Sequence, residues 1–356
     1  MSGLFLRMPT RALFRWINIS GRRGRLAGVL LALAACQARQ ETAPDSHPPV
    51  GHYEGSLSAP GQPALRAALD IRHPRPGHYE AEFTAPGAGA LSFVADSVLF
   101  ADGRLRLTRP ARPGQTLALT RDGDFWRGAF ALDSLHAPLI LVRRGPPNPS
   151  AYRVAAGPEP GPAWLFAPAD TGTAGPALAL LPDAATAPAA ALWADALARE
   201  GVIVLVLPAA DSATAPAERA RVRAALRLLR GTAGADTANV GLWAAGARAG
   251  GVAQLLAEAD GPRPAFFIAQ NAVLGPAARA AVRELGHRKL PVLGLAGGEA
   301  AARRVSELRE ALGGGRRAGA GRAYRSAGPD LLVPGSLGPR FGPGLPADVV
   351  EWLRGH

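Results

Sequence analysis

The chain has 356 residues, of which 48% are hydrophobic and 19% charged, a composition typical of a globular protein with a large hydrophobic core. Its formal net charge of +12 is in the range of nucleic-acid-binding proteins, but six arginines lie in residues 1–35, where there is no acid. The remaining +6 comes from arginines spread along the chain with few aromatic residues among them, so nucleic-acid binding is not indicated. The length favours two domains.

Residues 1–35 are predicted to be a lipoprotein signal peptide. Basic residues precede a ten-residue apolar stretch, 26–35, which is too short to cross a bilayer as a helix but typical of a secretion signal. The stretch ends in Leu-Ala-Ala-Cys, which resembles a bacterial lipobox, and Cys36 is the only cysteine of the chain. We therefore expect Cys36 to be lipidated and the protein to be anchored at the cell envelope, facing the periplasm or the cell exterior. The alternative is an incidental thiol.

Residues 36–49 are polar and proline-rich, as is typical of a tether between a membrane and the first folded domain. Residues 50–145 are predicted to form a small all-β domain, a sandwich or an open barrel, because short apolar runs alternate with Gly and Pro. The expected strands lie at 64–72, 78–84, 91–100, 104–109, 116–120, 125–132 and 138–144. Four histidines of this segment match no compact metal-ligand spacing and are interpreted as surface side chains: His52, His73, His78 and His136.

Residues 146–175 are predicted to be a proline-rich linker with lead-in strands, and the pattern then changes. Residues 176–356 alternate strand-like and helix-like runs, which predicts a parallel sheet covered by helices on both faces. Strands are expected at 177–181, 202–207, 240–245, 265–270 and 290–296, and helices at 187–200, 215–230, 299–312 and through Val349, Trp352 and Leu353. The helix at 215–230 carries a basic stripe, for which we expect a solvated face, with contact to anionic lipid as the alternative: Arg219, Arg223, Arg227 and Arg230.

The segment from Thr237 to Ala259 predicts a strand, a tight turn of small residues and a helix. This is the layout of a nucleophile elbow, which normally holds a serine, cysteine or aspartate at the tip of the turn. Here no serine, threonine or cysteine lies between Asn239 and Glu258.

The order of these segments resembles the α/β-hydrolase fold, and more narrowly bacterial α/β-hydrolase lipoproteins with a small β domain first. The stretch beginning "GHYEGSLSAPGQPALRAALDI" looks like that β domain. The stretch "ALALLPDAATAPAAALWADALAREGVIVLVL", followed by "ANVGLWAAGARAGG", looks like the hydrolase core from its oxyanion strand to its elbow. The resemblance covers most of residues 50–356 and implies a Ser-His-Asp triad.

The positions that match this triad hold other residues. Aligned on the elbow glycines, the serine position is Arg248; aligned on "VGLW", it is Gly246. The oxyanion strand runs into Pro182-Asp183 instead of a His-Gly turn, Glu299 lies one residue from the acid position, and Asp330 aligns with the histidine. Because a triad needs a nucleophile, a base and an acid, we predict a degenerate site in a binding or structural protein of the envelope. We expect Arg248 to pair with Asp330 or Glu299, or alternatively to reach solvent or to bind an anion.

The alternative function is an active serine-hydrolase-type esterase or peptidase with a rearranged site, for which Ser326, Glu299 and His356 remain. His287 precedes a strand and is expected at the wrong end of the sheet. The segment between Ala269 and Lys289 has room for one helix, so no large lid is expected. No cofactor or metal is expected, because the chain has no phosphate-binding loop with lysine, no Cys/His spacing and no dinucleotide fingerprint. The expected partners are the membrane, through the lipid anchor, and a small anionic ligand or an envelope protein.

Overall fold

The computed structural model describes residues 47–59, 61–95, 97–109, 111–157, 163–209, 214–313 and 320–355. Residues 45–356 form one compact unit. The predicted signal peptide, Cys36, most of the tether and His356 lie outside the described residues, and the predicted domain boundaries stay predictions. No helix in the described ranges is long and apolar enough to cross a membrane.

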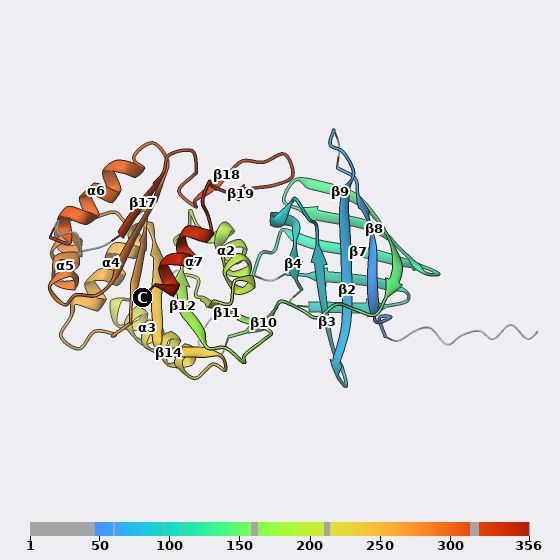
Figure 1. The fold of residues 1–356 in the computed structure, drawn as a ribbon, viewed down its shortest axis with the longest axis horizontal. Coiled ribbons are helices and arrows are strands. Elements are labelled where there is room, and N and C mark those ends of the chain that lie inside the picture. The colour runs from blue at the N-terminus through green and yellow to red at the C-terminus, as the bar shows by residue number, and fades with distance from the viewer. Residues whose placement is uncertain are drawn as a thin grey trace, which may run out of the picture. The chain divides into compact units, whose positions relative to one another are not determined.

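The first part of this unit is an antiparallel sheet of nine strands that curls on itself (Figure 1). The strands are β1 (Gly51–Leu57), β2 (Leu65–Arg75), β3 (His78–Thr84), β4 (Phe93–Val94), β5 (Ser97–Ala101), β6 (Arg104–Thr108), β7 (Gln115–Asp122), β8 (Phe125–Leu132) and β9 (Leu135–Gly145). Their order across the sheet is β4-β3-β2-β1-β9-β8-β7-β6-β5, and a short 3₁₀ helix, η2 (Gly89–Leu91), precedes β4. The all-β prediction is confirmed, in the form of a partly open barrel rather than a sandwich.

Buried and exposed residues alternate along the strands, so that one face of this sheet packs in an aromatic core. In β7 the buried residues Leu117 and Leu119 alternate with exposed ones, as expected for a half-buried strand. The core holds Trp126 and a stacked pair of rings, Phe83 and Phe130, whose centroids are 5.3 Å apart. The other face of the sheet is therefore left for polar residues or for a partner.

The second part is a mixed sheet of eight strands. Its strands are β10 (Tyr152–Ala156), β11 (Trp164–Pro168), β12 (Gly175–Leu181), β13 (Ile203–Val206), β14 (Ala235–Ala245), β15 (Phe267–Gln270), β16 (Val292–Gly297) and β17 (Ala320–Tyr324). The order is β10-β11-β13-β12-β14-β15-β16-β17, antiparallel at the two β11 pairings and parallel from β13 to β17. A two-stranded ribbon, β18 (Leu332–Val333) and β19 (Arg340–Phe341), follows.

Six helices of the described chain cover this sheet: α2 (Ala187–Arg199), α3 (Ala215–Arg230), α4 (Gly246–Ala257), α5 (Pro276–His287), α6 (Ala301–Ala311) and α7 (Ala347–Arg354). Buried residues of α2 and α7 pack in one hydrophobic cluster, and those of α3, α4 and α5 in another. The strands between them are apolar on both sides: Leu178 and Leu180 of β12 join the first cluster, and Ala177 and Ala179 join the second. The chain thus has the α/β-hydrolase-like fold predicted from the sequence, preceded by a curled β sheet.

Candidate functional site

The turn from β14 to α4 is built around Gly246. The strand residues before it are buried, and Gly246 itself has a φ of +54°, a left-handed conformation that residues with a side chain rarely adopt. The helix starts at this residue, so Gly246 stands at the tip of the elbow and Arg248 lies two residues into the helix. The left-handed backbone of the turn therefore belongs to Gly246 and not to Arg248.

The space in front of Gly246 is filled by the side chain of Asp183. An ideal Cβ on Gly246 would lie 1.8 Å from Asp183 Oδ2, which is inside any tolerable contact distance. Asp183 follows β12 and is fixed by its neighbour Thr186, whose backbone N–H and hydroxyl donate to Asp183 Oδ1 at 3.0 and 2.8 Å. The carboxylate therefore lies at the amino terminus of α4, where the helix dipole favours a negative charge.

Arg248 pairs with Glu218 of α3. Its Nε and Nη2 donate to Glu218 Oε1 at 2.8 and 2.7 Å, and its Nη1 donates to the carbonyls of Pro182 and Leu207 at 3.0 and 2.7 Å. Burial lowers the pKa of the guanidinium, although Glu218 beside it acts in the opposite direction. The Arg248 side chain thus links three places: Pro182 after β12, Leu207 after β13, and helix α3.

The predicted pairing of Arg248 with Asp330 or Glu299 is wrong. The first turn of α4 presents Arg248 toward α3, whereas Asp330 and Glu299 lie in loops after β17 and β16. Glu299 is exposed in the turn before α6. Asp330 uses its own Oδ1 to accept the N–H of Leu332 at 3.1 Å, in a local turn.

The loop that holds Asp330 is fixed by buried polar side chains that the sequence analysis did not single out. Gln270 accepts the indole N–H of Trp243 at 2.8 Å and donates to the carbonyl of Pro329 at 2.7 Å. Trp193 of α2 donates to the carbonyl of Asp330 at 3.0 Å. The backbone of the loop at Pro329 and Asp330 is thus held in place by buried side chains. The sequence signal for this was a pair of amide side chains at the end of β15, Gln270 and Asn271.

The remaining predicted residues do not gather into a catalytic group. Ser326 and His287 are exposed, and His287 ends α5, before β16. No group of three or more His, Cys, Asp or Glu residues that could hold a metal occurs within the described residues.

A cavity of about 410 Å³ opens beside the elbow. Three carboxylates and one guanidinium line it, together with Gln254 and apolar residues such as Leu255: Asp183, Glu218, Glu258 and Arg248. The guanidinium is already bonded to Glu218 and two carbonyls, so the free hydrogen-bonding capacity of the wall is mainly that of acceptors and of the Gln254 amide.

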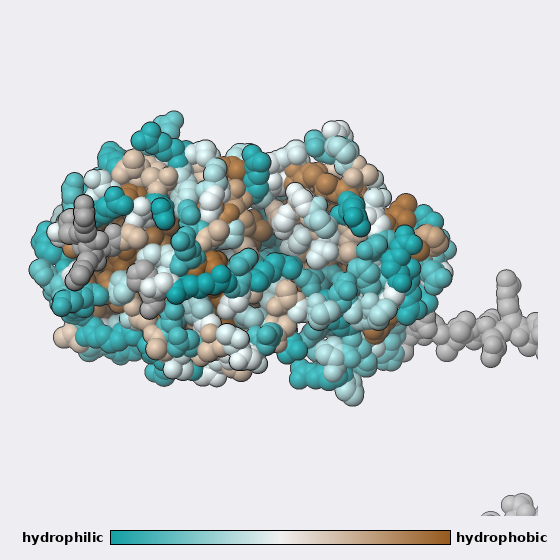
Figure 2. All heavy atoms as spheres, viewed as in Figure 1, coloured by the Kyte–Doolittle hydropathy of each residue, from teal (hydrophilic) through white to brown (hydrophobic). Residues whose placement is uncertain are grey.

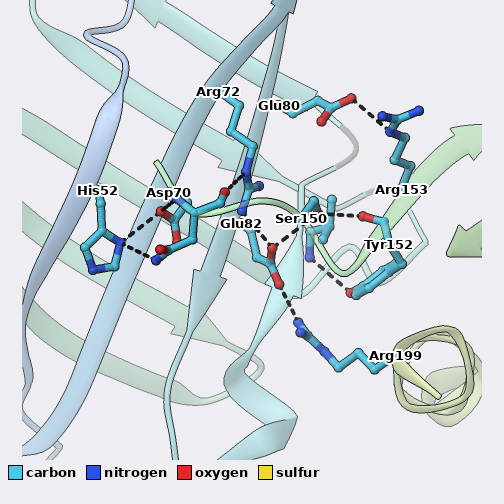
Figure 3. Close-up of polar contacts among 11 residues, drawn as sticks. His52, Asp70, Arg72, Glu80, Glu82, Ser150, Tyr152, Arg153 and Arg199 are labelled. Atoms are coloured by element: carbon cyan, nitrogen blue, oxygen red, sulfur yellow. Dashed lines mark hydrogen bonds and ion pairs between the residues drawn. The ribbon is translucent and has the colours of Figure 1, made fainter. Parts of the chain in front are cut away.

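The curled sheet is joined to α2 by ion pairs that the sequence did not predict. Glu82 of β3 binds Arg72 at 3.0 Å and Arg199 of α2 at 2.9 Å, and the hydroxyl of Ser150 donates to the same carboxylate (Figure 3). A second pair, Arg109 with Asp195 of α2 at 2.7 Å, is buried. Burial raises the pKa of the Asp195 carboxyl, against the attraction of Arg109.

His52 is the one histidine of the four whose expected surface position is wrong. Its side chain is only 16% exposed, and Nδ1 lies 2.9 Å from Asp70 Oδ1 (Figure 3). On the other side of the ring, Nε2 lies 3.2 Å from Glu54 Oε1. The backbone N–H of Asn148 donates to the same Asp70 oxygen at 2.7 Å. Burial lowers the pKa of His52, but these two carboxylates outweigh it and the pKa is raised. The other three histidines are exposed: His73, His78 and His136.

The chain is similar to several solved hydrolase structures at low identity. A dienelactone hydrolase from Anabaena variabilis is 17% identical over 58% of this chain and 99% of its own, with a TM-score of 0.43. A putative dienelactone hydrolase from Klebsiella pneumoniae is 17% identical over 49% of this chain and 85% of its own, with a TM-score of 0.35. Dipeptidyl peptidase 4 from Porphyromonas gingivalis is 13% identical over 85% of this chain but half of its own length, with a TM-score of 0.42. No protein-family model and no curated protein matches the chain.

Proposed function

We propose that this protein uses an α/β-hydrolase fold to bind a ligand rather than to hydrolyse one, and that a lipid on Cys36 holds it at the cell envelope. The proposal that the protein binds rather than hydrolyses a ligand rests on the positions of Gly246 and Asp183. The elbow tip has no side chain to attack a carbonyl, and the space for one is taken by a carboxylate. A serine mechanism needs a nucleophile with an adjacent base, and none of the described residues supplies that pair.

The cavity beside the elbow is the ligand site in this proposal. Its volume of about 410 Å³ is within the range of small-molecule pockets. The small anionic ligand expected from Arg248 would have to displace Glu218 from the guanidinium. Glu218 is already paired with Arg248 and Arg221, and Glu258 with Arg219. Asp183 is the lining carboxylate without an ion pair among the described residues, and it favours a ligand with a positively charged group and an apolar portion that meets Leu255.

The envelope location rests on the sequence around Cys36 alone. Replacing Cys36 by serine is expected to release the protein from the membrane fraction, since a detergent-partitioning anchor would be lost. An envelope protein remains a further candidate partner. Unchanged partitioning of Cys36→Ser would show that something other than acylation holds the protein.

The alternative function is an ester or peptide hydrolase with a rearranged site. Ser326, Glu299 and His356 would have to build it, and Ser326 and Glu299 are exposed, with no bond between them in the structure. The fold permits this activity in principle, so the two proposals are separated by an assay.

The decisive assay offers the full chain p-nitrophenyl esters and aminoacyl anilides, together with a fluorophosphonate probe that labels activated serines. We expect no turnover above buffer and no mass increase from the probe. Turnover that is lost in Ser326→Ala would establish the hydrolase instead.

Ligand binding is tested separately by thermal shift with panels of small amines and small carboxylates. Gln254→Trp should remove any shift produced by a cavity ligand, because the indole would fill the space that Gln254 lines. An exposed substitution on α6, Ser306→Trp, is the matched control. A carboxylate that shifts the transition while amines do not would reverse the assignment of ligand charge.

A further inference from the structure

The face of the curled sheet turned away from its aromatic core carries exposed apolar and basic side chains together. Strand register places them on one side. Leu99 of β5 lies opposite Arg106 of β6. Thr120 of β7 lies between Arg104 of β6 and Arg127 of β8, and Arg127 in turn lies opposite Ile140 of β9. Phe125 is two residues from Arg127 on β8 and so shares this side. We call it the outer β5–β9 face, defined by Leu99, Arg104, Arg106, Phe125, Arg127 and Ile140.

Exposed large apolar side chains of the described chain concentrate on this face. The four such residues are Leu99, Phe125, Ile140 and Val273, with exposed fractions of 57%, 40%, 47% and 58%, and the first three lie here. Figure 2 shows apolar surface, in brown, exposed between hydrophilic residues over the curled sheet. Single exposed apolar residues are ordinary, but three on one sheet face set among arginines suit a partner that is both apolar and anionic.

The cations of the face are in excess of its acids. Arg127 pairs with Asp122 at 3.1 Å and stacks over Phe125, whereas Arg104 and Arg106 have no acidic partner within the described residues. Two acids lie in turns at its rim, Asp102 and Asp124. Strand register places Arg121 and Arg143 opposite the buried residues Trp126 and Tyr53, on the other side of the sheet.

The basic stripe of α3 behaves differently. Arg219 and Arg223 pair with Asp260, and Arg219 also pairs with Glu258. Arg227 and Arg230 have no acidic partner within the described residues, so α3 also keeps two arginines without an ion pair. None of the exposed large apolar residues of the described chain lies on α3, which favours the solvated-face interpretation of the stripe.

The chain enters the sheet near this face. β1 starts at Gly51 and pairs with β9, where Glu54 lies opposite Val142. Val142 lies opposite Phe125 of β8, so β1 adjoins the strands of this face. His47 lies eleven positions after Cys36, which allows a span of up to roughly 36–40 Å at 3.3–3.6 Å per residue. A lipid on Cys36 would therefore keep the outer β5–β9 face within reach of the bilayer.

We propose that the outer β5–β9 face docks on the headgroup layer of an anionic membrane, an inference that rests on the proposed lipid on Cys36. Leu99, Phe125 and Ile140 enter the boundary between headgroups and acyl chains, while Arg104 and Arg106 meet lipid phosphates. An acyl anchor gains stability from a second, basic signal of this kind. Each arginine near an anionic surface contributes about a fivefold gain in partitioning.

The experiment uses the acylated full chain reconstituted into vesicles of phosphatidylcholine, with or without phosphatidylglycerol. Because Cys36 is the only cysteine and is consumed by the lipid, a single thiol can be introduced and labelled with an environment-sensitive dye. We place it at Leu99→Cys on the face and, as a matched control, at Ser306→Cys, which is exposed on α6. We expect a blue shift at position 99 in phosphatidylglycerol vesicles, a smaller one in neutral vesicles, and none at position 306.

Arg104→Gln with Arg106→Gln should reduce the ratio of docked to undocked protein at position 99 by about 25-fold in phosphatidylglycerol vesicles and leave position 306 unchanged. Equal signals at the two positions would overturn the proposal. So would a blue shift at position 99 that follows protein density rather than lipid charge, which would mean contact with a second copy. Failure of the proposed anchor is distinguishable, because the protein would then not co-float with vesicles of either composition.

Discussion

Asp183 Oδ2 lies where the Cβ of any residue other than glycine at position 246 would have to be, 1.8 Å from its ideal position. The two residues come from different strand ends, 63 positions apart, and together they close the elbow. The carboxylate takes the space of a nucleophile, and the glycine provides both the room and the left-handed backbone. This mutual dependence makes the site testable by substitution.

Gly246→Ala should lower the free energy of unfolding by about 2–5 kcal/mol. Overpacking against Asp183 accounts for roughly 1–3 kcal/mol and the left-handed φ for roughly 1–2 kcal/mol. Gly251→Ala is the matched control on the same helix, since a Cβ there meets nothing within 4 Å, and it should stabilise by roughly 0.5–1 kcal/mol. Urea unfolding measures both. Adding Asp183→Gly to Gly246→Ala should recover the part of the unfolding free energy that overpacking removed. If the effects of the two substitutions on the unfolding free energy were strictly additive, the contact between the two residues would be contradicted.

A serine at position 246 should not create an esterase. Gly246→Ser supplies a hydroxyl, but no described histidine lies near the elbow to take its proton, and Asp183 occupies its space. Hydrolysis of p-nitrophenyl acetate by Gly246→Ser and by Gly246→Ser with Asp183→Gly measures this. A rate above that of Gly246→Ala in either variant would show that a base is at hand after all.

Arg248→Ala should destabilise the protein by about 2–4 kcal/mol. The side chain is 10% exposed and Glu218 16%, so removing the arginine leaves two carbonyls without this donor and a largely buried carboxylate with only Arg221 as its ion-pair partner. Arg303→Ala, on a side chain that is 75% exposed, should cost about 0–1 kcal/mol. Chemical unfolding of the two variants compares them. Arg248→Lys should not restore full stability, because an ammonium cannot reproduce the fork of contacts; full restoration would contradict this account.

Gln270→Leu should lower the free energy of unfolding by about 1–3 kcal/mol, because the indole N–H of Trp243 and the carbonyl of Pro329 would lose a buried partner. Hydrogen exchange in the loop that contains Asp330 should rise in the same variant. Gln254→Leu is a suitable control, since Gln254 is exposed. Unchanged exchange at residues 328–332 would mean that the hydrogen bonds from Trp193 and Asn271 are enough to hold the loop.

His52 should make stability fall as the pH rises. Its pKa in the folded protein is raised above 6.5, so the protonated imidazole between Asp70 and Glu54 stabilises the fold. That contribution is fully present below about pH 6.5 and is lost as the pH rises through the folded-state pKa. Urea midpoints at pH 6 and pH 8 should differ less in His52→Asn than in the wild type. The exposed control His136→Asn should keep the wild-type difference between the two urea midpoints. A larger difference in His52→Asn would mean that protonated His52 does not stabilise the fold.

The local pattern of the sequence was enough to predict most helices and strands. The helix at 215–230 coincides with α3, and the strands at 78–84 and 125–132 coincide with β3 and β8, since amphipathic periodicity over a dozen residues is set by local burial. The strand-helix alternation predicted the parallel strands covered by helices in the same way. Where the pattern was short or interrupted it failed: β1 was not among the expected strands, and the run at 91–100 is divided into η2, β4 and β5.

The sequence by itself determined that the triad positions hold no serine or histidine, because that is a statement about residue identity. Only the tertiary structure decided which residue is at the elbow tip, that Asp183 fills the space before it, and that Arg248 pairs with Glu218. These contacts join residues 30 or more positions apart. The packing of α3 and α4 against the strand ends decides which residues come into contact. The periodicity of a sequence does not predict which neighbour a buried charge will contact.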